Sequence, residues 1–241
     1  MAQRGSGRYV VGMFRAINLT LAQMPSKPFR QVFWWSLLLS LATAIAVWIG
    51  VYWVLADTEI VGSLPFVGSW VETLVEWGIG FATFALTILL LPAFLGIYAS
   101  LFLETICRAV EREYYPHLEA PRGQSIWEGI WTGLRFAVII VFFNILFLPF
   151  FIFLPGIAYW ILNGILFGRE YYELVAFRRL SPREAATLRR QRRPSLFAGG
   201  IVIAIVASIP IVNLILPLFG TAFMLHLYES RMKSPAINGL N

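Results

Sequence analysis

The residues best suited to bind a ligand are the cations just before the first long apolar segment of the chain. Lys27 and the segment Pro28–Gln31 place an ammonium and the Arg30 guanidinium at the start of a stretch without charge. A guanidinium offers a planar fork of donors that matches tetrahedral oxyanions. Cations also anchor the cytoplasmic ends of membrane-spanning helices, so the pattern allows either an oxyanion site or simple anchoring.

Groups that could carry covalent or metal chemistry are scarce. The two histidines, His117 and His226, lie far apart without a metal-binding spacing, and Cys107 is the single cysteine. The sequence contains no nucleophile elbow, phosphate-binding loop or Cys/His cluster, and no acid lies inside an apolar window to relay protons. We therefore expect no enzymatic activity, no cofactor and no bound metal.

Long uncharged segments define the class of protein. Apolar residues make up 59% of the 241 residues and charged residues only 13%, against roughly a quarter in soluble domains. Asp, Glu, Lys and Arg are absent from four windows, residues 32–56, 78–103, 136–168 and 196–228. A membrane-spanning helix needs roughly 20 apolar residues. The sequence therefore predicts an all-α integral membrane protein with a single membrane domain over residues 1–241.

The distribution of charge predicts which side of the membrane each segment faces. Residues 1–31 contain five cations and no acid, whereas residues 57–77 contain four acids and no cation. Residues 169–193 contain eight arginines against three acids. Because cytoplasmic flanks are enriched in Lys and Arg, we expect both termini in the cytoplasm. We also expect spanning helices at 32–56 and 78–103, with an outer loop at 57–77.

The two later windows are expected to be hairpins, since each must leave and return on the cytoplasmic side. In the first, residues 136–148 and 155–168 would make helices of about 20 and 21 Å, shorter than the roughly 30 Å hydrocarbon core. Prolines, which interrupt helices, fall near the middle of both windows, at Pro149 and Pro155 in the first and at Pro210 and Pro217 in the second. We therefore favour two re-entrant hairpins, 136–168 and 196–228, over the alternative of two short complete spans in each window.

A re-entrant hairpin would point the N-terminus of its second helix at the middle of the membrane. Free N–H groups and the helix dipole attract anions to that end, and broken helices are used in this way at transport sites. The hairpin tips expected to line a pore are Pro155, Gly156, Pro210, Asn213 and Pro217. The alternative is that the hairpins only pack against other helices.

Two further helices are expected on the cytoplasmic side. Apolar residues between 9 and 24 recur at helical spacing, which predicts an amphipathic helix at the membrane surface that ends before Pro25. Ser181 and Glu184 form the pattern of a capping box, with proline at the first helical position. This pattern predicts a short helix over 182–193, whose arginines would face lipid headgroups or concentrate anions.

The C-terminal window also contains a specific motif. Residues 209–217 read Ile-Pro-Ile-Val-Asn-Leu-Ile-Leu-Pro and are followed by Gly220-Thr221-Ala222. This run resembles the signature of the CysZ-type sulfate permeases, which belong to the etoposide-induced-protein domain family. The resemblance covers most of the chain, from about Gly12 to Tyr228. It includes the amphipathic start, the two long helices and the two proline-broken hairpins.

The resemblance implies sulfate uptake for cysteine synthesis through a channel-like pore in the bacterial inner membrane. The sulfate-binding motif of that family, G-L/I-R-R, corresponds in position to the four residues after Lys27. Arg30 keeps the first arginine of the motif. The other three positions differ, with Pro28 at the glycine, Phe29 at the aliphatic residue and Gln31 at the second arginine. By resemblance Arg30 would bind sulfate. The residues that would assist it are Lys27, Phe29 and Gln31.

A sulfate channel is therefore our first hypothesis for the function. The alternative is a scaffold or bilayer-shaping protein that does not transport, because shallow hairpins would wedge one leaflet. A lipid-processing enzyme is a third interpretation, which lacks a nucleophile and base. Irregular backbone at membrane depth must be covered by protein or line a water-filled cavity. We therefore expect a homo-oligomer, with membrane lipids as further partners and no nucleic acid.

Overall fold

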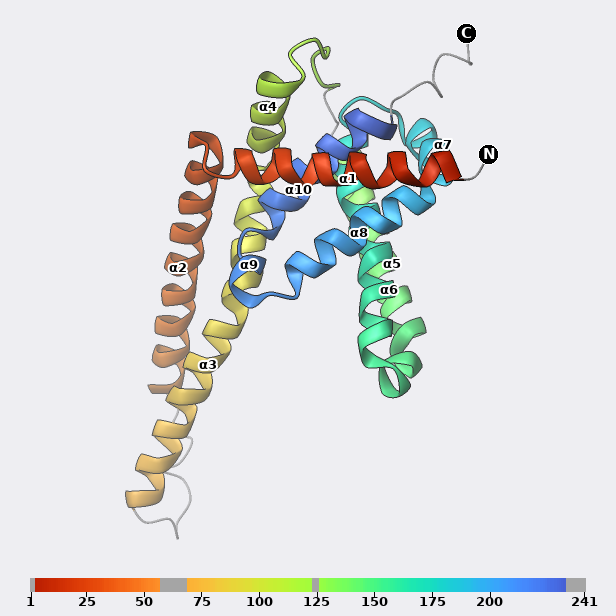
Figure 1. The fold of residues 1–241 in the computed structure, drawn as a ribbon. Coiled ribbons are helices and arrows are strands. Elements are labelled where there is room, and N and C mark those ends of the chain that lie inside the picture. The colour runs from red at the N-terminus through yellow and green to blue at the C-terminus, as the bar shows by residue number, and fades with distance from the viewer. Residues whose placement is uncertain (1–2, 57–68, 123–125, 233–241) are drawn as a thin grey trace. The chain divides into compact units, whose positions relative to one another are not determined.

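The computed structural model describes residues 3–56, 69–122 and 126–232, which form helices joined by short links (Figure 1). No β-strand occurs in these residues, so the predicted all-α class is confirmed. The chain divides into two compact units. One contains residues 1–30 and 103–241, and the other contains residues 31–102.

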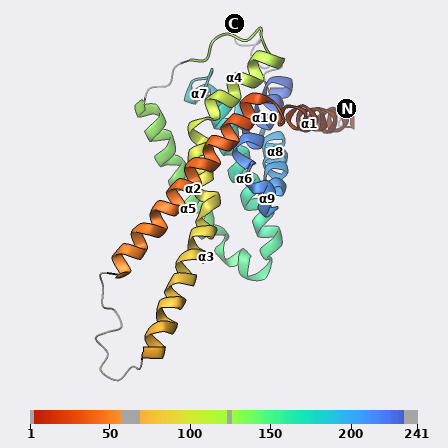
Figure 2. The same ribbon diagram turned by 90° about the vertical axis from the view of Figure 1, so that its left-hand side faces the viewer.

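The smaller unit consists of two long helices. Helix α2 runs over Lys27–Ala56 and belongs to this unit from residue 31 onward, and α3 runs over Ser69–Leu101. Figure 2 shows the two helices antiparallel, and the Thr43 and Tyr98 hydroxyls are hydrogen-bonded to each other. The two helices predicted for the first two windows are therefore present as an antiparallel pair, and that both of them span the membrane stays a prediction.

The boundaries of this hairpin differ from the prediction at α3. The expected outer loop, 57–77, lies partly outside the described residues, and α3 already begins at Ser69. Glu72 and Glu76 indicated a loop, but Glu72 lies in the first turn of α3, where the helix dipole favours an acid. The same helix ends at Leu101, two residues before the end of the uncharged window.

Helix α2 exposes large apolar side chains. Within the described residues, Lys27–Val51 is the stretch long and apolar enough to cross a membrane, with a mean hydropathy of 2.0. Apart from Phe29 in the first turn, its buried side chains are small or of medium size, namely Val32, Ser36, Ser40 and Ala44. Its exposed ones include Trp34, Trp35, Leu38 and Ile45. A helix of a soluble protein would bury residues of the second kind, so this surface is suited to lipid.

The larger unit is built around its last long helix. Its elements are α1 Gln3–Gln23, α4 Leu103–Tyr114, α5 Ile126–Phe153, α6 Pro155–Ala176, α7 Pro182–Gln191, α8 Arg193–Ala207, α9 Pro210–Asn213, α10 Leu216–Leu227 and a π-helical turn, Tyr228–Met232. Helix α10 contacts α1, α4, α6 and α8. All of its residues except Pro217 are buried. The run that carries the sequence motif therefore leads into the core of this unit.

The first hairpin, α5 and α6, turns at Leu154 and Pro155. Pro149 was expected to interrupt it, but this proline lies inside α5 and the helix continues to Phe153. A single proline removes only one backbone donor, and membrane helices tolerate this loss. Both helices also extend beyond the uncharged window, to 28 and 22 residues, or about 42 and 33 Å. Helix length therefore does not separate a re-entrant hairpin from two complete spans here.

The second hairpin has shorter arms. Helix α8 contains 15 residues and α10 contains 12, about 22 and 18 Å, and the four-residue α9 lies between them. Both lengths fall short of the roughly 30 Å hydrocarbon core. Pro210 begins α9 and Pro217 is the second residue of α10, so the prolines fall at the turn, as predicted.

The two hairpins meet where α6 and α8 bring their backbones into direct contact. A Cβ atom at Gly200 would lie 1.9 Å from the Gly164 carbonyl oxygen, and one at Gly168 would lie 2.3 Å from the Leu196 carbonyl oxygen. Small residues permit this close approach between helices in membranes. No side chain could be added at these positions without separating the helices.

We predict that Gly200→Ala destabilises the protein by about 1–3 kcal/mol, the usual cost of overpacking, because α8 must move away from α6. The measurement is thermal unfolding in detergent. Gly50→Ala is the matched control, because a Cβ at Gly50 meets no atom within 4 Å and alanine favours a helix over glycine. Equal unfolding temperatures for Gly200→Ala and the unmodified protein would contradict the prediction.

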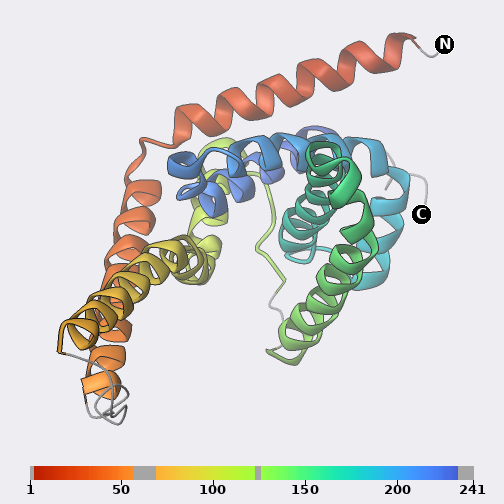
Figure 3. The same cartoon turned by 90° about the horizontal axis from the view of Figure 1, so that it is seen from below.

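Helix α1 packs against α10 (Figure 3). The small or polar residues Ala16, Thr20 and Gln23 of α1 are buried, and the Gln23 amide donates to Glu113 of α4 over 2.9 Å. The apolar stripe seen in the sequence points elsewhere, since Phe14 and Leu21 are 62% and 53% exposed. The predicted amphipathic helix exists. Its place at the membrane surface stays a prediction.

Candidate functional site

The start of α2 presents two exposed cations. Lys27 is the first residue of the helix, and the side chains of Lys27 and Arg30 are both exposed. Neither has an ion-pair partner among the described residues. The Arg30 backbone N–H donates to the Ser26 carbonyl, 3.1 Å away, while the Ser26 hydroxyl is buried and has no described hydrogen-bond partner. A buried hydroxyl without a partner is uncommon. Ser26 directly precedes Lys27 in the chain and lies four residues before Arg30.

The two other residues of the predicted sulfate site have different environments. Phe29 is buried, with 1% of its surface exposed, so its ring fixes the start of α2 from the inside. Gln31 is exposed at the next position along the helix from Arg30. The structure thus leaves Lys27, Arg30 and Gln31 accessible to an ion, and it assigns Phe29 a packing contact.

The predicted tip residues lie at two separate turns (Figure 1). Pro155 and Gly156 begin α6, whose N-cap, Leu154, makes no side-chain hydrogen bond to the helix. Pro210 and Asn213 begin and end α9. Pro217 lies in the first turn of α10, whose N-cap also lacks a side-chain hydrogen bond. Because the turns lie apart, they do not form one constriction within the chain, and their role in a pore stays a prediction.

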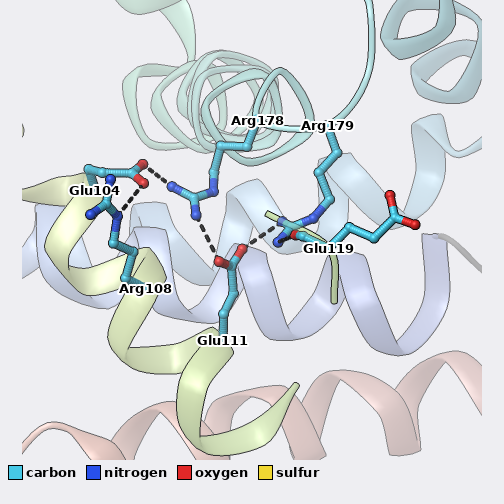
Figure 4. Close-up of polar contacts among 6 residues, drawn as sticks. All are labelled: Glu104, Arg108, Glu111, Glu119, Arg178 and Arg179. Atoms are coloured by element: carbon cyan, nitrogen blue, oxygen red, sulfur yellow. Dashed lines mark hydrogen bonds and ion pairs between the residues drawn. The ribbon is translucent and has the colours of Figure 1, made fainter. Parts of the chain in front are cut away.

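A buried cluster of charges joins α4 to the end of α6 (Figure 4). Arg178 donates to Glu104 and, at 2.8 Å, to Glu111. Arg179 donates to the other carboxylate oxygen of Glu111, 2.6 Å away, and to the Glu119 carbonyl oxygen at 3.0 Å. The side chains of Arg178 and Glu111 are only 7% and 11% exposed. Glu111 therefore binds two neighbouring arginines from inside the protein.

The electrostatics of the cluster are those of a structural ion-pair network. Burial and the neighbouring Arg179 lower the pKa of Arg178 to about 10, which leaves it charged at neutral pH. Burial opposes the charge of Arg179, but the hydrogen bond and the charge of Glu111 raise its pKa overall. The guanidiniums of Arg178 and Arg179 are paired with the carboxylates of Glu104 and Glu111, so these ion pairs join α4 to the end of α6.

Sequence reasoning did not find this cluster. Glu104 and Glu111 are seven residues apart, which places them on one face of a helix, and that spacing was a usable signal. Their shared partner Arg178 lies 74 residues after Glu104 and 67 residues after Glu111 in the chain. No local pattern specifies which of the many arginines in residues 169–193 would pair with them.

We predict that Arg178→Met destabilises the protein by about 3–5 kcal/mol, because it leaves Glu111 buried with one arginine fewer. The measurement is unfolding in detergent, followed by tryptophan fluorescence. Arg108→Met is the matched control, because Arg108 pairs with Glu104 at 2.9 Å on the surface and is 73% exposed. Such exposed pairs contribute about 0–1 kcal/mol. Equal losses in the two variants would contradict a buried structural role.

The fold and the sites together define a helical membrane protein in which a long hairpin precedes two proline-turned hairpins and exposed cations stand at a helix start. The chain belongs to the EI24 family, described as Sulfate transporter CysZ/Etoposide-induced protein 2.4, which it matches over residues 16–217. This match confirms the resemblance drawn from the sequence. A comparison with curated proteins and with solved structures found no match.

Proposed function

We propose that this protein carries sulfate, or a closely similar tetrahedral oxyanion, across the bacterial inner membrane for cysteine biosynthesis. The observation that carries the proposal is the pair of exposed cations at the start of α2, which have no ion-pair partner in the described part of the chain, in a member of a family described as sulfate transporters. An isolated cation on a surface is ordinary. Two of them at the N-terminus of a 30-residue helix combine side-chain charge with a favourable helix dipole.

Arg30 is the main ligand in this proposal. Its guanidinium can donate two parallel hydrogen bonds to one oxyanion, and Lys27 adds a second charge without that geometry. Gln31, which replaces the second arginine of the family motif, supplies an uncharged donor. Pro28 has no backbone N–H, so it adds no donor at this helix start. The site would then hold sulfate less tightly than one with two arginines, which suits an ion that must leave again.

The hairpin turns are the proposed lining of the path. The N-termini of α6 and α10 carry backbone N–H groups that no side chain caps. Such groups attract anions when water is excluded. In this role Pro155 and Pro217 give the turns their shape, and Gly156 keeps the first turn free of a side chain.

We infer that both termini are cytoplasmic and that several copies assemble. The apolar surface of α5 supports assembly or lipid contact, because Trp127, Trp131, Phe142 and Phe153 are all exposed in the single chain. Irregular backbone at the two turns also needs cover from protein or water. A second copy of the chain would supply that cover.

A bilayer-shaping role without transport is the second candidate. It is favoured by the exposed apolar stripe of α1, which includes Phe14 and Leu21. A helix of this kind lies in the membrane surface with its apolar side among the lipids. In this role the protein would bind and deform vesicles while no anion crosses.

We predict that purified protein in liposomes conducts labelled sulfate and that Arg30→Ala lowers the flux by about tenfold or more, since hydrogen bonds to a charged group contribute about 1.5–3 kcal/mol. Lys27→Gln should lower the flux by a smaller factor. Arg183→Ala, which removes an exposed cation of α7, is the matched control and should leave the flux unchanged. Flux no greater than that of empty vesicles would rule out transport, and full flux in Arg30→Ala would remove Arg30 from the site.

We predict a second result for the orientation. In a Cys107→Ser background, Gln191→Cys on α7 should react only with a membrane-permeant thiol reagent. Thr58→Cys should react with a membrane-impermeant reagent added from outside. Gln191 is exposed, whereas burial raises the pKa of Cys107 to about 12 and leaves that thiol unreactive. Labelling of Gln191→Cys by the impermeant reagent in intact cells would overturn the cytoplasmic orientation.

A further inference from the structure

Hydroxyl side chains gather on one face of α2. Ser36, Ser40 and Thr43 follow one another at spacings of four and three residues, which places them on one side of the helix. Ser36 and Ser40 are fully buried, and Thr43 is half-buried. Large apolar side chains such as Leu38 and Ile45 are exposed instead. The helix thus keeps these polar groups away from the surface that is suited to lipid.

Helix α3 carries a second set of hydroxyls on the side that faces α2. The Tyr98 hydroxyl is hydrogen-bonded to that of Thr43, so Tyr98 marks this side of α3 (Figure 2). Thr83 and Thr87 precede Tyr98 by 15 and 11 residues, which are close to whole numbers of helical turns. Both threonines are half-buried. They therefore lie on the same side of α3 as Tyr98.

The two sets follow each other along the helix pair. We call them together the hydroxyl track, which consists of Ser36, Ser40 and Thr43 on α2 and of Tyr98, Thr87 and Thr83 on α3. The helices are antiparallel and joined at Thr43 and Tyr98, so the set on α3 begins where the set on α2 ends. The parts on α2 and α3 are about 10 and 22 Å long. The whole track therefore has about the length of the roughly 30 Å hydrocarbon core.

The Ser36 hydroxyl is the member of the track that packing does not explain. It is buried and has no hydrogen-bond partner among the described residues. The Ser40 hydroxyl, by contrast, donates to the Ser36 carbonyl over 2.6 Å, and the Thr87 hydroxyl donates to the Thr83 carbonyl over 2.8 Å. A buried hydroxyl without a partner is destabilising, and alanine would allow equally close packing. A ligand that accepts its hydrogen bond would account for the hydroxyl.

Neutral hydroxyls suit an ion that must pass and not stay. Each can donate a hydrogen bond to an oxyanion in place of a water molecule, as the carbonyls of a selectivity filter replace the water around a cation. Residues 32–56 and 78–103 contain no charge, so no arginine holds the ion along the track. Arg30 lies six residues before Ser36 on the same continuous helix, about 9 Å along its axis. The exposed cations thus stand at one end of the track.

We propose that the facing sides of α2 and α3 form a path through the membrane, along which the hydroxyl track replaces part of the hydration shell of a tetrahedral oxyanion. The inference rests on the proposed function for the identity of the ion, but not for the existence of the path. The end near Arg30 is closed in this structure, because Ser36 and Ser40 are fully buried. Passage of an ion therefore requires α2 and α3 to separate at that level.

The first test measures the flux of labelled sulfate into liposomes together with the unfolding temperature in detergent. Ser36→Ala should lower the flux about tenfold, because one hydrogen bond to a charged group is lost. Its unfolding temperature should stay equal or rise, because an unsatisfied buried hydroxyl is removed. Leu38→Ala is the matched control, since Leu38 is 59% exposed on the other side of the same helix, and its flux should be unchanged. Full flux in Ser36→Ala, as a packing role predicts, would overturn the proposal.

The second test detects the path without measuring transport. In the Cys107→Ser background, Ser40→Cys and Leu38→Cys are treated on both sides of the membrane with an anionic methanethiosulfonate, which reacts with thiols in contact with water. We expect Ser40→Cys to react, sulfate to slow that reaction, and Leu38→Cys to stay unreactive among the lipids. The exposures in the closed structure predict the opposite order, because Ser40 is buried and Leu38 is exposed.

The two tests separate failure of the path from failure of the proposed function. Reaction of Leu38→Cys without reaction of Ser40→Cys would overturn the path, even in a protein that transports sulfate. Reaction of Ser40→Cys in a protein that moves no sulfate would support the path and would refute sulfate transport instead.

Discussion

The contact between the backbones of α6 and α8 sets the position of everything on the charged end of the larger unit. A side chain at Gly168 or Gly200 would meet main-chain atoms of the opposite helix, so the separation of the two helices is fixed by main-chain atoms. Helix α7 lies between them in the chain, and its place follows from theirs. The α6–α8 contact thus helps to set the position of the α7 arginines, although no charged residue takes part in that contact.

The many arginines near this interface fall into two groups with different physics. Arg178 and Arg179 are buried and fully matched by acids of α4, so they contribute to packing and leave little attraction for a ligand. Arg169 and Arg189 share Glu173, and Lys27 and Arg30 have no acid partner among the residues that the structure describes. Because net local charge decides whether an anion is attracted, the number of arginines in a segment is a poor guide to its function.

Much of the fold could be predicted from the sequence, since uncharged windows and prolines are local signals. The capping box at Ser181 and the turn at Pro210 are such cases. The predicted break at Pro149 was wrong, because the sequence does not distinguish a proline inside a helix from a proline at a turn. Arg30 could be named as a candidate from its place just before a long uncharged window. The pairing of Glu173 with Arg189 could not, because it depends on how α7 folds back onto α6.

Helix α1 has a buried face and an exposed apolar face on opposite sides of one helix. One face, with Ala16 and Thr20, lies against α10, and the opposite side exposes Phe14 and Leu21. Because a helix is a stiff rod, a surface that binds the exposed side of α1 also fixes the orientation of its buried side. The most buried helix of the unit is therefore mechanically coupled to whatever lies outside α1. Removing α1 would take away a wall of the core along with an amphipathic surface.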